Sequence, residues 1–127
     1  MTKLIYIAFG GALGAVLRYA VANGAQRLTE GTFPVGTLVV NTLGCLAVGL
    51  LGTLFAGPIL VREEVRFALL LGFLGGFTTF STFGFETFAL LTDGEWWWAA
   101  ANVTLANTLG LLAVWSGYRL AGLWWGV

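Results

Sequence analysis

The residues between Gly72 and Phe83 have the composition of a segment that handles an ion. Two adjacent glycines, Gly75 and Gly76, are followed by Thr78 and Thr79, and these residue types favour helix interiors poorly. We expect the backbone to unwind here and to divide one helix into two half-helices. Carbonyls freed by such a break need partners, and in discontinuous membrane helices they can coordinate a cation. A glycine-kinked but continuous helix is the alternative interpretation.

Two phenylalanines, Phe80 and Phe83, follow the expected break and share one face of the second half-helix. An aromatic ring has a negative face and a positive edge, so ring edges could contact an anion without holding it tightly. Ordinary core packing also explains such a pair, and on the residues alone it is the favoured interpretation. Glu86 follows one turn later, where it could gate the path, neutralise charge or simply lie at the interface.

Polar side chains in two other apolar stretches could serve the same ion. Thr37 and Asn41 are four residues apart, and the Asn41 amide has two N–H donors for an entering anion. A hydrogen bond between helices is the alternative, worth about 0.6–2 kcal/mol in a membrane. Arg18 could attract anions to a vestibule, or its long side chain could reach the membrane interface.

A third polar group lies near the end of the chain. Thr104, Asn107 and Thr108 have the spacing of one helical face. They could form a track of hydroxyl and amide groups along a pore wall. Hydrogen bonding that holds helices together is an equally good interpretation of these three residues.

Composition requires that these groups be positioned inside a membrane. The chain has 127 residues, of which 58% are hydrophobic and 9% charged, whereas a soluble domain carries about 25% charged residues. The net charge of zero gives no reason to expect nucleic acid as a partner. With no histidine, one cysteine and no carboxylate pair at membrane depth, the sequence predicts no enzyme.

Four apolar segments cover most of the chain, at residues 4–22, 36–60, 65–91 and 96–123. Each approaches or exceeds the ~20 residues that a spanning helix needs. Tryptophans at 96–98 and 124–125 bracket the fourth segment, as expected at two membrane interfaces. Pro34 is expected to open the second helix, and Gly57-Pro58 to end it. The sequence therefore predicts one all-α transmembrane domain over residues 1–127, with its third helix broken at the centre.

Short helices with many glycines predict close packing and assembly. Gly10 and Gly14 have GxxxG spacing, as do Gly72 and Gly76, which lets helix backbones approach closely. Because four short helices enclose little space, we expect at least a homodimer. The charge distribution slightly favours termini in the cytoplasm. The first segment resembles a cleavable secretory signal, but Arg18 interrupts its apolar region, so we expect it to be retained.

The run Gly72–Phe83, GFLGGFTTFSTF, resembles the signature of the Fluc (CrcB) fluoride channels. Residues 10–19, GGALGAVLRY, are similar to the first helix of that family, and residues 36–41, GTLVVN, to the start of its second. These stretches follow one another in the right order and extend over most of the chain. The third-helix run is highly specific, so the resemblance reverses the interpretation of Phe80 and Phe83 in favour of a pore.

The resemblance implies a passive, fluoride-selective channel in the cell (inner) membrane that exports F⁻ and so relieves fluoride toxicity. It also implies an antiparallel, dual-topology homodimer with two pores and one structural Na⁺ on the dimer axis. By position, Gly75 and Thr78 would bind Na⁺ through their backbone carbonyls. The implied fluoride path consists of Phe80, Phe83, Asn41, Ser81, Thr82, Thr104, Asn107, Thr108 and Arg18. Asn107 departs from the serine expected there, although an amide can still donate.

Two other functions fit a small four-helix membrane protein. A small multidrug exporter needs a membrane-embedded acid in its first helix to exchange protons for a cationic drug. The first span here contains Arg18 and no acid, which argues against that function. A scaffold subunit that transports nothing would not require a broken helix.

Overall fold

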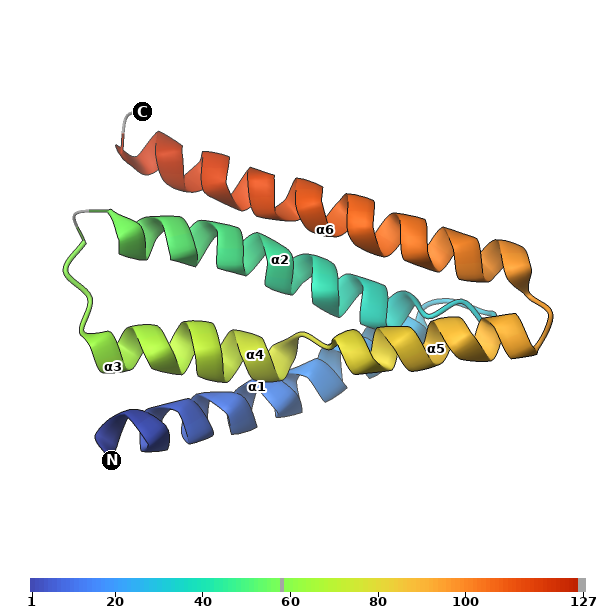
Figure 1. Ribbon diagram of the computed structural model, residues 1–127, viewed down its shortest axis with the longest axis horizontal. Coiled ribbons are helices and arrows are strands. Elements are labelled where there is room, and N and C mark those ends of the chain that lie inside the picture. Colours follow the sequence, from blue (N-terminus) through green and yellow to red (C-terminus); the bar gives the residue numbers. More distant parts are fainter. Residues whose placement is uncertain (58, 126–127) are drawn as a thin grey trace.

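The computed structural model describes residues 1–57 and 59–125, and all of the regular elements in these ranges are helices (Figure 1). In chain order they are α1 (Thr2–Arg27), α2 (Val35–Ala56), α3 (Glu63–Arg66), η1 (Phe67–Phe73), α4 (Leu74–Phe77), α5 (Phe80–Thr92) and α6 (Trp96–Trp125). The elements α3, η1, α4 and α5 follow one another along a single rod, interrupted once between α4 and α5.

Four helical segments are long and apolar enough to cross a membrane: Thr2–Arg27, Val35–Ala56, Glu63–Thr92 and Trp96–Trp124. The expectation of four spanning helices is therefore confirmed, and the chain is a multi-pass membrane protein. The amino terminus, the α2–α3 connection and the carboxyl end of α6 lie at one end of the bundle (Figure 1). The α1–α2 and α5–α6 connections lie at the other end.

The second helix is shorter than the apolar segment that contains it. It begins at Val35, directly after Pro34, as the proline predicts. It ends at Ala56 rather than at residue 60, because Gly57 has an extended backbone with φ −86° and ψ −166°. Gly57 therefore ends the helix as expected, while Pro58 lies outside the described residues.

Glycines bring α1 against the third span without intervening side chains. A Cβ atom at Gly10 would overlap the Ala68 carbonyl oxygen, and one at Gly14 would overlap that of Phe73. From the other side, a Cβ atom at Gly76 would lie 2.5 Å from the Gly11 carbonyl oxygen. The close approach expected from the GxxxG spacing is confirmed, and it fixes the half of the third span that precedes the break.

The stretch facing α1 is a π-helix, η1, of seven residues. Its Ala68 and Phe73 carbonyls are the groups that face Gly10 and Gly14. π-Helical turns are rare and frequently occur near functional sites. Here the π-helix leads directly into α4 and the break.

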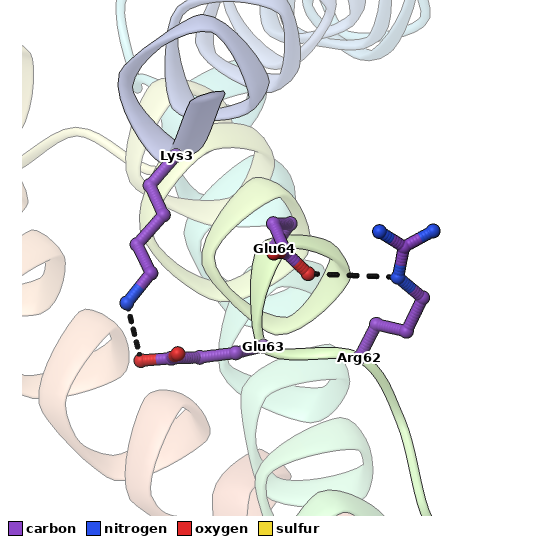
Figure 2. Close-up of polar contacts among 4 residues, drawn as sticks. All are labelled: Lys3, Arg62, Glu63 and Glu64. Carbon is purple, nitrogen blue, oxygen red and sulfur yellow. Dashed lines mark ion pairs between the residues drawn. The ribbon is translucent and has the colours of Figure 1, made fainter. Parts of the chain in front are cut away.

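A charged cluster ties the start of α1 to the start of the third span (Figure 2). Lys3 Nζ lies 2.7 Å from Glu63 Oε1 and 5.3 Å from the centre of the Phe67 ring. Arg62 Nε lies 3.6 Å from Glu64 Oε2. The Lys3 and Glu63 side chains are about half exposed, so this pair adds at most about 1 kcal/mol of stability.

Candidate functional site at the helix break

The third span is interrupted at Thr78 and Thr79, whose backbones are extended, with φ/ψ of −81°/157° and −152°/115°. The break lies within the expected run Gly75–Phe83 and is confined to the threonines, because Gly75 and Gly76 belong to helix α4. Contact with the Gly11 backbone holds Gly76 in place, where no larger residue fits. Threonine is β-branched and suits an extended backbone, so the break forms at the threonines.

Asn41 on α2 holds the break open with two hydrogen bonds. Its Nδ2 donates to the Thr79 carbonyl oxygen at 3.0 Å, and its Oδ1 accepts from the Thr79 backbone N–H at 2.8 Å. In a continuous helix the Thr79 N–H would donate to Gly75 O, four residues earlier. Asn41 therefore replaces the helical partners of Thr79 and leaves the Gly75 carbonyl without its usual donor.

Thr79 also begins the second half-helix, α5. Its Oγ1 accepts from the Thr82 backbone N–H at 3.2 Å, which is a side-chain cap of the helix N-terminus. The same hydroxyl donates to Thr82 Oγ1 at 2.9 Å and lies 3.4 Å from Ser81 Oγ. Three hydroxyls thus gather at the positive end of a helix dipole, an arrangement that favours an anion.

The carbonyl of Thr78 also loses its helical donor, because the Thr82 N–H is used by the cap. Arg18 Nη1 on α1 approaches this Thr78 oxygen at 3.4 Å, a weak hydrogen bond. Arg18 is half-buried in the described subunit, so its guanidinium lies beside the break. It also lines a cavity of about 230 Å³ together with Asn23, Thr37 and Thr82.

A larger cavity of about 360 Å³ opens at the break, between α2 and the two half-helices. Its walls include Asn41, Gly75, Thr78 and Phe80. Gly75 is exposed in the described subunit, and nothing lies within 4 Å of the position that a Cβ atom would occupy there. The predicted carbonyl-bearing residues and the Asn41 amide therefore line one open space.

The rings of Phe80 and Phe83 pack together at the start of α5. Their centroids are 5.5 Å apart and their planes are tilted by 44°. Phe80 is 83% exposed, whereas Phe83 is half-buried. Phe80 is thus no core residue of the described subunit, which removes simple burial as the explanation of its side chain.

Glu86 lies one turn beyond Phe83 and bonds to α2. Thr37 Oγ1 donates to Glu86 Oε1 at 2.8 Å, so Thr37 and Asn41 both connect α2 to the region after the break. Among residues 1–57 and 59–125, no hydrogen-bond partner is found for the buried second oxygen of Glu86. The hydrogen bonds between helices that were the alternative interpretation of Thr37 and Asn41 are therefore present in the structure.

The fourth-helix residues do not meet the break in the same way. Thr104, Asn107 and Thr108 share an exposed face of α6. Asn107 Nδ2 donates to the Val103 carbonyl of its own helix at 2.7 Å. A residue that the sequence did not single out, Asn102, is instead buried and donates to Thr87 Oγ1 on α5 at 2.9 Å. The sequence could have indicated Asn102, because an asparagine at membrane depth needs a hydrogen-bond partner.

This geometry agrees with a comparison of the whole chain with known protein families. A profile described as "CrcB-like protein, Camphor Resistance (CrcB)" matches residues 5–118. The chain belongs to the CrcB family. The match reaches into all four spans and includes the break and Asn41.

Three CrcB relatives of this chain carry the same name. A "Fluoride-specific ion channel FluC" of Geobacter sulfurreducens is 46% identical over 121 residues, which are 95% of this chain and 98% of that protein. Proteins of the same name from Nitrosococcus oceani and Chloroflexus aurantiacus are each 44% identical, covering 94% and 99% of this chain and 95% and 99% of those proteins, respectively. These relatives are named as ion channels, and the family is one of ion channels rather than of enzymes.

Proposed function

We propose that the chain is a subunit of a fluoride-selective channel that exports F⁻ passively across the cell (inner) membrane and relieves fluoride toxicity. Relatives about 45% identical over nearly their whole length are named fluoride-specific channels. The observation that carries the proposal is the break at Thr78–Thr79, which Asn41 holds open. It brings the N-terminus of α5, three hydroxyls and the Phe80–Phe83 ring pair to one place.

Fluoride chemistry suits this combination of groups. Fluoride is small and strongly hydrated, so a pore must replace its water with several hydrogen-bond donors. The Asn41 amide has two N–H donors and uses one on Thr79, so one is available for an anion. Ring edges of Phe80 and Phe83 add weak positive contacts. A fixed cation in the narrowest part would hold the anion too tightly for conduction.

The proposal is tested by fluoride efflux from liposomes that contain the purified protein, measured with a fluoride electrode. Wild-type protein should release trapped fluoride much faster than empty liposomes and should leave chloride trapped. Fluoride release no faster than from empty liposomes, or equal release of both anions, would show that the proposed function is wrong.

Replacing either ring tests the role of the phenylalanines. Phe80→Ile and Phe83→Ile should each slow fluoride flux by about three- to tenfold, because an aliphatic side chain lacks the positive ring edge. Elution on size exclusion should stay that of wild type, showing that assembly is intact. Wild-type flux in both variants would contradict the ring-edge role.

We further propose that the channel is a homodimer of antiparallel subunits. In a single subunit Phe80 is 83% exposed, and Gly75 and the Thr104, Asn107 and Thr108 face of α6 are exposed as well. A second copy would enclose these groups and complete the fluoride path. Accessibility of tags at the termini tests the orientation: tags on both sides of the membrane are expected, and tags found on one side alone would contradict dual topology.

A structural Na⁺ at the subunit interface is part of the same proposal. Gly75 and Thr78 offer neutral carbonyl oxygens, the ligand type of broken membrane helices, and Asn41 has taken the usual donor of Gly75. Arg18 uses one lone pair of the Thr78 oxygen and leaves the other. Two copies would supply four such carbonyls to a bound ion, which would hold the half-helices together. The oxygen donor set therefore fits sodium.

Bound Na⁺ should stabilise the folded protein by mass action. We expect the unfolding temperature in detergent to rise as Na⁺ replaces N-methylglucamine at constant ionic strength. Equal unfolding temperatures in the two cations would contradict a structural sodium site.

A further inference from the structure

Within the described subunit, the half-helix α5 has little apolar burial to hold it in place. Of its residues 80–92, all of which are described, only Leu90 is buried, while Phe80, Phe85 and Phe88 are exposed. Side-chain hydrogen bonds instead connect α5 to its neighbours. Asn41 and Thr37 bond it to α2, and Asn102 bonds it to α6. The orientation of its rings therefore depends on a few polar contacts.

Thr87 is the point at which α6 acts on the turn that carries Phe83. The Thr87 hydroxyl donates to the Phe83 carbonyl oxygen at 2.7 Å and accepts from Asn102 Nδ2 at 2.9 Å. Asn102 is 2% exposed, so solvent does not compete with Thr87 for its amide. With its donor and an acceptor position both used, the hydroxyl has a fixed orientation. These bonds form a continuous path from α6 to the backbone of Phe83.

We propose that Asn102 and Thr87 are positioning residues that set the orientation of the Phe83 ring by anchoring its turn of α5 to α6. This inference rests on the proposed function, in which the ring edge of Phe83 contacts fluoride. Asn102 and Thr87 act through the Phe83 carbonyl and not by binding the anion themselves. Loss of their mutual bond frees the turn to tilt away from α6, and the Phe83 ring tilts with it.

Other threonines show which part of this arrangement is special. Thr53 donates to Gly49 O at 2.7 Å, the same bond to the carbonyl four residues earlier. In the part of the chain that the structure describes, Thr53 has no second side-chain partner from another helix. Thr53→Val therefore removes the local bond alone, whereas Thr87→Val also removes the connection to α6. The pair is a matched comparison of one chemical change in two settings.

The first readout is fluoride efflux at matched amounts of folded protein. Thr87→Val and Asn102→Leu should each lower the rate about three- to tenfold, the effect of one membrane hydrogen bond. The double variant should be no slower than the slower single variant, because all three lack the same bond. Thr87→Ser and Thr53→Val should stay within about twofold of wild type, since they keep the Asn102 bond.

The second readout needs no transport. With 4-fluorophenylalanine at position 83, the ¹⁹F signal reports the surroundings of the ring. Thr87→Val and Asn102→Leu should shift or broaden this signal, while Thr53→Val should leave it unchanged. An unchanged signal in Thr87→Val, or single-variant flux losses that multiply in the double variant, would overturn the positioning role.

The two readouts separate this inference from the proposed function. If wild type releases no fluoride but Thr87→Val still moves the ¹⁹F signal, the fluoride channel is wrong and the anchoring of Phe83 stands. If wild type conducts fluoride and Thr87→Val behaves as Thr53→Val in both readouts, the channel stands and the anchoring is wrong.

Discussion

Replacing Asn41 by leucine should lower fluoride flux by at least about tenfold. Leucine has a similar volume but offers neither the donor nor the acceptor that Thr79 uses at 3.0 and 2.8 Å. Each backbone group left without a partner costs about 1–3 kcal/mol, so the open break loses about 2–6 kcal/mol relative to a closed helix. The Thr79 N–H then returns to Gly75 O, its partner in a continuous helix.

Closure of the break would remove two features together. The capped N-terminus of α5 would disappear, and the Gly75 carbonyl would no longer be free. Thr42→Val is the matched control on α2, because Thr42 donates at 2.7 Å to Leu38 O within its own helix. Liposome efflux should be near normal for Thr42→Val and strongly reduced for Asn41→Leu. Normal flux through Asn41→Leu would show that the Asn41 bonds are not needed to hold the conducting structure.

Adding one methyl group at Gly14 should destabilise the protein by about 1–3 kcal/mol. The Cβ atom of Gly14→Ala would overlap the Phe73 carbonyl oxygen and lie 2.9 Å from the Phe77 backbone nitrogen. Both neighbours are backbone atoms of the third span, so no side-chain rotation relieves the overlap. Helix α1 must move away from η1 and α4, and the contact that precedes the break is lost.

Gly52→Ala on α2 is the control, and its expected change in stability is zero or positive rather than negative. Nothing lies within 4 Å of the position that its Cβ atom would occupy, and alanine favours a helix over glycine by up to about 1 kcal/mol. The unfolding temperature in detergent should therefore fall for Gly14→Ala and stay level or rise for Gly52→Ala. A Gly14→Ala protein as stable as Gly52→Ala would mean that α1 does not pack as closely as described.

The four spans were predictable because apolar composition and helix-ending residues determine local structure. Apolar length identified the spanning segments, Pro34 marked the start of α2, and Gly57 marked its end. The apolar segment itself continues to residue 60, since hydrophobicity alone does not show where a helix stops. The presence of a break in the third span was predictable from the unusual run of glycines and threonines.

Which residues of the expected run Gly75–Phe83 form the break was not predictable from helix propensity. Glycine is the poorer helix former, yet Gly76 stays helical because the α1 backbone packs against it. Thr78 and Thr79 are extended because Asn41, distant in sequence, supplies the partners for Thr79. Tertiary contacts thus decided between two local candidates. The π-helix η1 was not predicted from the sequence.

Partners between helices were the least predictable part of the site. Thr37, Asn41 and Arg18 were singled out as polar residues at membrane depth, but their partners Glu86, Thr79 and Thr78 come from the packing. Asn102 was not predicted as a site residue, although it is buried on α6 and donates to Thr87 on α5. Helical spacing showed that Thr104, Asn107 and Thr108 share a face, but it could not show that this face is exposed in one subunit.

The reversal potential of the purified protein in a planar bilayer tests the central claim most directly. A fluoride gradient is set across the bilayer with chloride as the opposing anion. A fluoride-selective passive channel predicts a reversal potential that shifts by about 59 mV for each tenfold change in the fluoride gradient, as for any singly charged permeant ion. A reversal potential that ignores the fluoride gradient, or that follows chloride, would contradict fluoride selectivity.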